Sequence, residues 1–235
     1  MAKHLSQEEE EKLVREFFGD AKDGFFVEVG ANHPTINSQT WHLEQSGWTG
    51  VLIEPQPDLA AFLVTSRSAK VFAVACSSPD KAGSPLPLYV AGPLSSLDRS
   101  TMTPGAKTEY MLMVPVRTLD DILGEAEAPT PIDLLSIDVE GHEIDVLRGF
   151  DLAHWRARLI LLEDFVGDLR KHRFLKSNGY RLVRRVGNNG WYVPGDSPVK
   201  AGSEDRKEIF RKYYLALPFR VLRNLSRRIR NAFKD

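Results

Sequence analysis

Short apolar segments alternate with helix-like segments along most of this 235-residue chain, and this alternation restricts the fold more than any other feature. The apolar segments predict seven strands, at Phe25–Val29, Val51–Ile53, Lys70–Ala75, Ile132–Ile137, Leu159–Leu162, Tyr180–Val186 and Trp191–Val193. The intervening segments predict helices at Ser6–Phe18, Ser38–Ser46, Leu59–Val64, Leu119–Leu123, Glu143–Arg148 and Leu169–Asn178. This order is typical of an α/β fold with a Rossmann-like, doubly wound sheet and helices on both faces. The turn Gly187–Gly190 predicts that the last two strands form an antiparallel pair.

One segment, Ser77–Pro115, breaks the alternation. It is rich in proline and glycine, which predicts a long irregular excursion that contains one hairpin. Long loops in compact domains are often functional. We therefore expect this excursion to lie near a binding site.

Polar residues follow several predicted strands, at the edge where ligands bind in a doubly wound sheet. Five such places occur, namely Gly30–Asn32, Glu54, Ala75–Ser77, Asp138–His142 and Glu163–Asp164. Because the carboxyl ends of parallel strands meet at one edge, we expect these groups to form a single site. Ser77 is included among the expected cofactor contacts.

The turn after the first strand predicts a ligand without phosphates. Gly30 lacks a Cβ and lets a ligand approach the backbone closely. The G-x-G-x-x-G pattern of dinucleotide-binding proteins is absent, since Asn32 and Thr35 occupy the second and third glycine positions. Glu54 ends the second strand, where an acid accepts hydrogen bonds from ribose hydroxyls in related folds. The combination favours an adenosyl ligand, whereas the alternative is a plain tight turn with an ordinary carboxylate.

Four segments carry a resemblance to a known family. The runs FFVEVGAN (25–32), NSQTWHLEQSGWTGVLIEPQP (37–57), VRTLDDIL (116–123) and LLSIDVEGHEIDVLRGF (134–150) resemble FkbM-type S-adenosylmethionine-dependent methyltransferases in order and spacing. The resemblance covers about Gly24 to Pro194. It implies a seven-stranded class I methyltransferase fold, S-adenosylmethionine as the methyl donor, and O-methylation, commonly of sugar or polyketide hydroxyls.

The same resemblance implies residue roles. Glu28, Gly30, Ala31 and Asn32 would line the methionine part of the donor, and Glu54 would hold its ribose. Two departures occur: Glu28 replaces the usual Asp, and His33-Pro34 replaces the commoner Asp-Gly or Ile-Gly pair. The longer Glu28 still reaches a donor amino group, whereas Pro34 restricts the shape of the turn.

The segment after the fourth strand is the expected catalytic centre. Methylation of an alcohol requires a base that removes the hydroxyl proton while the oxygen is aligned with the methyl group. His142 has a pKa suited to that task near neutrality, and Asp138 or Glu140 would serve if burial raised its pKa. Asp138 is also an expected donor contact. The alternatives are a helix cap for Asp138 and a solvent-facing position for His142.

Three further residues are expected to bind the acceptor. Ser95 and Ser96, within the Gly92–Leu97 part of the excursion, fit a lid over a polyol, although serines in such loops often only form turns. Glu163 offers a carboxylate at the neighbouring strand end.

We predict no bound metal, because the resemblance implies no obligatory one and neither the histidines nor Cys76 show zinc-ligand spacing. The alternative is Mg²⁺ held by acidic side chains at two strand ends, Asp138, Glu140, Glu163 and Asp164.

The two ends of the chain differ from its body. We divide the chain into an N-terminal helix (1–23), a methyltransferase domain (24–200) and a basic helical tail (201–235). Residues 206–235 contain ten basic and two acidic side chains, with apolar residues at helical spacing after Pro218. Such a tail is suited to peripheral contact with an anionic membrane surface, or to docking on the acidic body or a partner. We do not expect nucleic-acid binding.

The start of the chain is acidic, no stretch reaches the ~18–20 apolar residues of a membrane span, and Cys76 is alone. The expected location is therefore the cytoplasm, and membrane contact by the tail would place the protein at the inner membrane face. The predicted function is S-adenosylmethionine-dependent O-methylation of a saccharide, glycolipid or related natural product. The alternatives are an NAD(P)-type oxidoreductase and a non-catalytic membrane- or partner-binding module.

Overall fold

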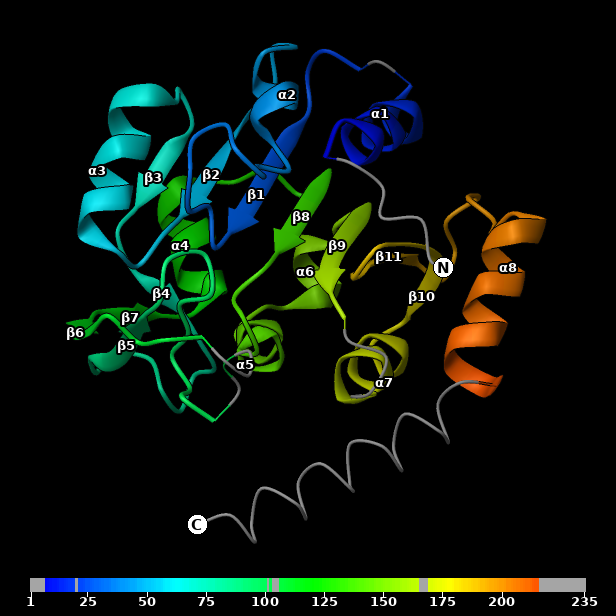
Figure 1. Cartoon of the computed structure of the whole chain (residues 1–235). Coiled ribbons are helices and arrows are strands. Elements are labelled where there is room, and N and C mark those ends of the chain that lie inside the picture. Colours follow the sequence, from blue (N-terminus) through cyan, green and yellow to red (C-terminus); the bar gives the residue numbers. More distant parts are fainter. Residues whose placement is uncertain (1–6, 20, 101, 103–105, 165–168, 216–235) are drawn as a thin grey trace, which may run out of the picture.

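The computed structural model of the protein describes residues 7–19, 21–100, 102, 106–164 and 169–215 (Figure 1). The strands of its main sheet are β1 (Phe25–Val29), β2 (Thr49–Ile53), β3 (Lys70–Phe72), β8 (Leu134–Ile137), β9 (Leu159–Glu163), β10 (Tyr180–Val186) and β11 (Asn189–Pro194). They lie in the order β10-β11-β9-β8-β1-β2-β3. The five strands from β9 to β3 are parallel, and β11 runs antiparallel to both of its neighbours. The predicted seven-stranded sheet with an antiparallel final pair is confirmed.

Helices cover both faces of this sheet because successive strand residues point to opposite sides. The helices are α1 (Gln7–Phe18), α2 (Trp41–Glu44), α3 (Pro57–Ser66), α4 (Leu119–Ala126), α5 (Glu143–Arg148), α6 (Leu152–Trp155) and α7 (Arg170–Ser177). Val27 and Val29 pack in one hydrophobic cluster with residues of α4, α5, α6 and α7. Phe26 packs on the other face with residues of α1, α2 and α3.

The helix expected over Ser38–Ser46 forms only at α2. Its first residues turn instead toward the sheet, because the hydroxyls of Ser38 and Thr40 donate to the buried Glu28 carboxylate at 3.0 and 2.5 Å. Serine and threonine side chains compete in this way with helix hydrogen bonds. The prediction was wrong at this end of the helix.

The strand expected over Lys70–Ala75 is divided in two. Strand β3 ends at Phe72, and β4 (Ala75–Cys76) pairs with β7 (Val116–Arg117) in a separate sheet. Between β4 and β7, the excursion contains the predicted hairpin, formed by β5 (Leu86–Val90) and β6 (Tyr110–Val114). The two ends of the excursion are therefore paired with each other.

The N-terminal helix α1 packs directly against the sheet. Val14 is fully buried, and the ring of Phe17 lies 6.3 Å from that of Trp191. The Phe18 ring lies 4.9 Å from Trp48. Trp48 and Trp191 are both core residues, 3% and 1% exposed.

The described part of the C-terminal tail begins with α8 (Ser203–Phe210) and continues as a π-helical turn, η1 (Arg211–Leu215). Tyr213 in this turn is buried, and its hydroxyl donates to the Asp164 carboxylate at the end of β9. The amphipathic helix predicted after Pro218 lies outside the described residues. Among the described residues, no helix combines the length and the apolar character needed to cross a membrane.

Candidate active site

A cavity of about 530 Å³ lies beyond the carboxyl ends of β1, β2 and β8, where the sequence places the site. Its polar lining includes Asn32, Glu54, Asp138 and Glu140. Its apolar wall includes residues from β2, the β3–β4 connection, β4 and the excursion, namely Ile53, Val74, Ala75, Cys76, Leu88 and Leu97. This volume is within the usual range for a small-molecule site.

The turn after β1 is fixed by contacts to two other strands. The amides of Gly30 and Ala31 both donate to the Ile53 carbonyl, at 2.9 and 3.1 Å. Gly30 has a φ of +85°, and a Cβ at this position would lie 1.9 Å from the carbonyl oxygen of Asp138. The space left by the missing side chain is thus occupied by protein backbone. The glycine therefore permits close approach of two loops, and because Gly30 also borders the cavity, its expected contact with the donor stays a prediction.

Glu54 is rigidly held at the end of β2. Its side chain is buried, and its two carboxylate oxygens accept hydrogen bonds from the amides of Asn32 and Gln56, each at 2.9 Å. Burial raises the pKa of Glu54, and these two hydrogen bonds oppose that rise. A carboxylate oxygen has a second acceptor direction, so Glu54 is able to receive hydroxyl donors from the cavity.

Glu28 lies elsewhere than expected. Its carboxylate is buried behind the β1 turn and accepts hydrogen bonds from Ser38, Thr40 and, at 2.8 Å, the amide of Gln39. Glu28 is not part of the cavity wall, whereas Gln39 is. The expectation that Glu28 itself contacts the donor is corrected: Glu28 positions the segment that carries Gln39.

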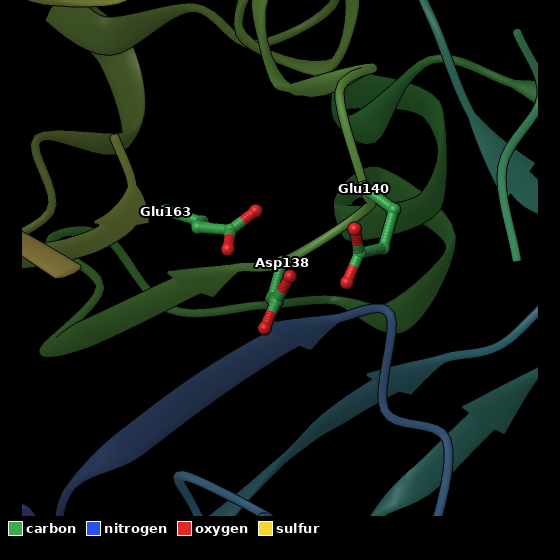
Figure 2. A group of neighbouring side chains, drawn as sticks. All are labelled: Asp138, Glu140 and Glu163. Atoms are coloured by element: carbon green, nitrogen blue, oxygen red, sulfur yellow. The ribbon is translucent and has the colours of Figure 1, made fainter. Parts of the chain in front are cut away.

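Asp138, Glu140 and Glu163 bring their carboxylate oxygens together at the ends of β8 and β9 (Figure 2). One oxygen from each residue lies within 4.8 Å of the other two. The loop that carries Glu140 is sharply turned, because Glu140 and Gly141 both have positive φ values, +49° and +100°. Asp138 and Glu140 line the cavity. The sequence analysis correctly predicted that polar residues after β8 and at the end of β9 come together.

Proximity and burial shift the pKa values of all three carboxyls upward. Burial, followed by the charge of Glu143, raises the pKa of Asp138 to about 6. Burial and the charges of Asp138 and Glu143 raise the pKa of Glu140 to about 7. Burial and the three neighbouring acids raise the pKa of Glu163 to about 8. Asp138 is reached by solvent from the cavity yet is surrounded by protein atoms on its other sides, which explains its desolvation.

A buried ion pair between Lys171 and Glu143 lies beside this cluster. The Lys171 ammonium donates to Glu143 at 2.9 Å and to the backbone carbonyl of Glu163 at 2.5 Å. Glu143 in turn accepts from the amide of Gly141 at 2.8 Å. Lys171 on α7 therefore links the end of β9 to the loop after β8.

His142 and Ser77 form a buried pair with each other. The Ser77 hydroxyl lies 2.9 Å from His142 Nε2, and His142 Nδ1 lies 3.6 Å from Asp145. Both residues are buried, and neither contributes to the cavity wall. Burial lowers the pKa of His142. The expected roles of His142 as the base and of Ser77 as a donor contact are corrected, because β4 turns Ser77 toward α5.

We expect His142→Ala to lower the free energy of unfolding by about 1–3 kcal/mol, because it leaves the buried Ser77 hydroxyl without its partner. The rate of methyl transfer by the folded variant should stay close to that of the unchanged protein. Denaturant unfolding and initial-rate assays measure the two effects. His154→Ala, at an exposed position on α6, is the control. Normal stability with lost transfer would reinstate His142 as the base.

The two lid serines line the cavity as expected, but their hydroxyls are used within the protein. Ser95 Oγ donates to the Gly92 carbonyl at 2.6 Å. Ser96 Oγ donates to the Glu140 carbonyl at 2.8 Å, which ties the lid to the carboxylate cluster. Asp164 is fully buried and faces away from that cluster, where its carboxylate accepts from Tyr192 at 2.9 Å.

Sequence reasoning missed Glu10, which reaches the cavity from α1. Its carboxylate accepts from Asn189 at 3.0 Å and from Gln39 at 3.2 Å. Burial raises the pKa of Glu10. Its sequence position is that of an ordinary acid in the first turn of a helix, so no local signal distinguishes it.

The model of the FkbM methyltransferase domain matches residues 28–182, which is more than half of the chain. A curated relative, "Methyltransferase 1" of Beauveria bassiana (strain ARSEF 2860), is 50% identical over 89 residues. That match covers 36% of this chain and 35% of the relative, so the chain spans about a third of the relative's length.

Two solved structures are also similar. The FkbM methyltransferase of Methylobacillus flagellatus KT has a TM-score of 0.47 and 14% identity, over 73% of this chain and 44% of its own. The precorrin-6y C5,15-methyltransferase of Geobacter metallireducens GS-15 has a TM-score of 0.42 and 11% identity, over 82% and 90%. The match to the domain model includes the β1 turn, Glu54 and the loop after β8. By this match, the chain belongs to the FkbM family of methyltransferases.

Proposed function

We propose that the protein is an S-adenosylmethionine-dependent O-methyltransferase whose acceptor is a hydroxyl of a saccharide, glycolipid or related natural product. One observation carries the proposal: a single cavity joins Glu54 at the end of β2 to Asp138 and Glu140 after β8. Strand β1 lies between β2 and β8, so the two strand ends are roughly 9–10 Å apart. This separation suits a nucleoside sugar at one end and a reacting group at the other.

The chemistry of the cavity fits such a donor. Glu54 presents fixed carboxylate oxygens to ribose hydroxyls, and Val74 and Cys76 offer an apolar surface for a base. The described cavity wall holds four carboxylates and no lysine or arginine. This charge favours a ligand with a positive sulfur and an ammonium group. The phosphates of a dinucleotide would meet only repulsion from these carboxylates, so the oxidoreductase interpretation is not retained.

When bound, the donor supplies a methyl group activated by a positively charged sulfur. The protein must then hold an acceptor oxygen in line with the sulfur–methyl bond. Asp138 and Glu140 are placed to accept a hydrogen bond from the acceptor hydroxyl and to take its proton as the oxygen–methyl bond forms. The sulfur–methyl bond breaks in the same step, which leaves a neutral thioether. Ser95, Ser96 and Leu97 close the cavity wall on the side of the excursion.

The direct test uses S-adenosylmethionine with an isotopically labelled methyl group. The purified protein is incubated with this donor and with separated glycan and lipid fractions. We expect label in a saccharide or glycolipid fraction, bound as an ether that resists mild base. Label that appears only on nitrogen, or in no fraction although S-adenosylhomocysteine binds, would contradict the proposed acceptor chemistry.

A further inference from the structure

Three carboxylates from two neighbouring strand ends face one another in the described site. Asp138 and Glu140 follow β8, and Glu163 ends β9. Figure 2 shows the Glu163 side chain extending toward the other two. One oxygen of each lies within 4.8 Å of the others. Carboxylates at such distances repel one another unless a positive charge or a shared proton lies between them.

Glu163 provides an independent indication that a ligand is held here. Its side chain is only 8% exposed, and its Oε2 atom has no hydrogen-bond partner among the described residues. A buried carboxylate oxygen without a partner is costly, and such atoms in native proteins usually have a partner. The carboxylate that carries this oxygen extends toward Asp138 and Glu140 (Figure 2), so a cation held by the three carboxylates would provide a partner for it.

Among the described residues, the negative charges around the cluster exceed the positive ones. Glu143 adds a fourth acid whose charge raises the pKa values of all three carboxyls. Lys171 opposes these shifts, but its ammonium is engaged by Glu143 at 2.9 Å and by the Glu163 carbonyl. One ammonium thus faces four acids. A divalent cation would neutralise the excess.

We propose that Asp138, Glu140 and Glu163 bind one divalent cation of the oxygen-preferring kind, Mg²⁺ or Mn²⁺. All three ligands are carboxylates, which suit these ions and not softer metals. From a metal–oxygen distance of about 2.1 Å, opposite oxygens on Mg²⁺ are about 4.2 Å apart and neighbouring ones about 3.0 Å, and only one of three pairs can be opposite. The carboxylate oxygens, which lie within 4.8 Å of one another, therefore need to close by up to about 1.8 Å through rotation of their side chains. This conclusion differs from our sequence-based expectation of no metal, and Asp164 is excluded because it bonds to Tyr192 and Tyr213.

The cation site adds an acceptor class to the proposed function. This inference about the acceptor rests on the proposed function. Octahedral coordination leaves positions beyond three protein ligands, and Asp138 and Glu140 both border the cavity. Two adjacent acceptor oxygens, as in a sugar diol, would fill such positions. Coordination of a hydroxyl lowers its pKa and orients it for transfer. The preferred acceptor is then a chelating diol rather than an isolated alcohol.

The experiment titrates Mn²⁺ into chelator-treated, full-length protein and follows the loss of the free-ion signal by electron paramagnetic resonance. We expect one Mn²⁺ per chain, displaced by Mg²⁺. Glu163→Gln should weaken binding at least about tenfold, because loss of a residue that merely orients a ligand already costs about 10- to 100-fold. The amide removes the negative charge that the neighbouring carboxylates repel, so this variant is expected to fold. Glu140→Gln, at a half-buried loop position, provides a second test.

Glu54→Gln is the matched control, since it changes another buried carboxylate of the site region to an amide. It should bind Mn²⁺ as the unchanged protein does. Absence of Mn²⁺ binding in the millimolar range would overturn the proposal. The proposal would also be overturned if Glu163→Gln and Glu140→Gln both bound Mn²⁺ as tightly as the unchanged protein does, because the ion would then be adventitious.

Failure of the cation site and failure of the proposed function are separable. S-adenosylhomocysteine is titrated by calorimetry into the same protein samples. Binding of this compound without Mn²⁺ binding would remove the cation site alone. Mn²⁺ binding that follows the expected pattern of variants, without S-adenosylhomocysteine binding, would leave the cation site and remove the proposed donor.

Discussion

Glu140→Gln is expected to slow methyl transfer by about 10²- to 10⁴-fold while leaving the affinity for S-adenosylhomocysteine essentially unchanged. The amide keeps the size of the side chain but loses the ability to accept a proton or to bind a cation strongly. Glu140 borders the cavity from the loop after β8, whereas Glu54, the residue proposed to hold the donor, lies beyond β1. The two functions are therefore separated in space.

Initial rates with the acceptor fraction that takes up label, together with calorimetric titration of S-adenosylhomocysteine, measure these two effects. Asp138→Asn should slow methyl transfer to a similar extent, because Asp138 lies in the same carboxylate cluster. Glu127→Gln makes the same chemical change at an exposed position after α4 and should transfer normally. Unchanged rates in both Asp138→Asn and Glu140→Gln would remove the catalytic assignment from this cluster.

Glu54→Ala is expected to weaken S-adenosylhomocysteine binding by about 10- to 100-fold. A hydrogen bond to a charged group contributes about 1.5–3 kcal/mol, and each tenfold change in affinity corresponds to about 1.4 kcal/mol. The Glu54 carboxylate is held in place by two backbone amides before any ligand arrives, so little ordering cost opposes these bonds.

Calorimetric titration measures this affinity directly. Asp58→Asn removes an exposed acid in the first turn of α3, four residues after Glu54, and serves as the control. Thermal unfolding without ligand checks that Glu54→Ala is folded, since the truncation also releases the amides of Asn32 and Gln56. Binding of equal strength in the folded variant would show that the nucleoside lies elsewhere.

The sheet was predictable from the sequence because its signals are local. Runs such as Phe25–Val29 are short, mostly apolar and almost wholly buried, and the turn before Trp191 indicates a hairpin. The chain order of strands and helices then places the carboxyl ends of the parallel strands at one edge. The position of the cavity next to Gly30, Glu54 and Asp138 follows from these local signals.

Side-chain direction was not predictable in the same way. Glu163 and Asp164 are neighbours in sequence, yet one joins the carboxylate cluster and the other bonds to Tyr192 and Tyr213. His142 is in the polar loop after β8, but it points toward Ser77, which lies 65 residues away in sequence.

The sequence by itself determined the sheet, the edge that carries the site and the membership of a methyltransferase family. The tertiary structure alone decided which carboxylates face one another and which polar residues, such as Glu28 and His142, are buried behind the cavity. The physical reason is that strand and helix patterns depend on neighbours within a few residues. The direction of a side chain after a strand depends on partners that are distant in sequence, as Glu10 and Asn189 show.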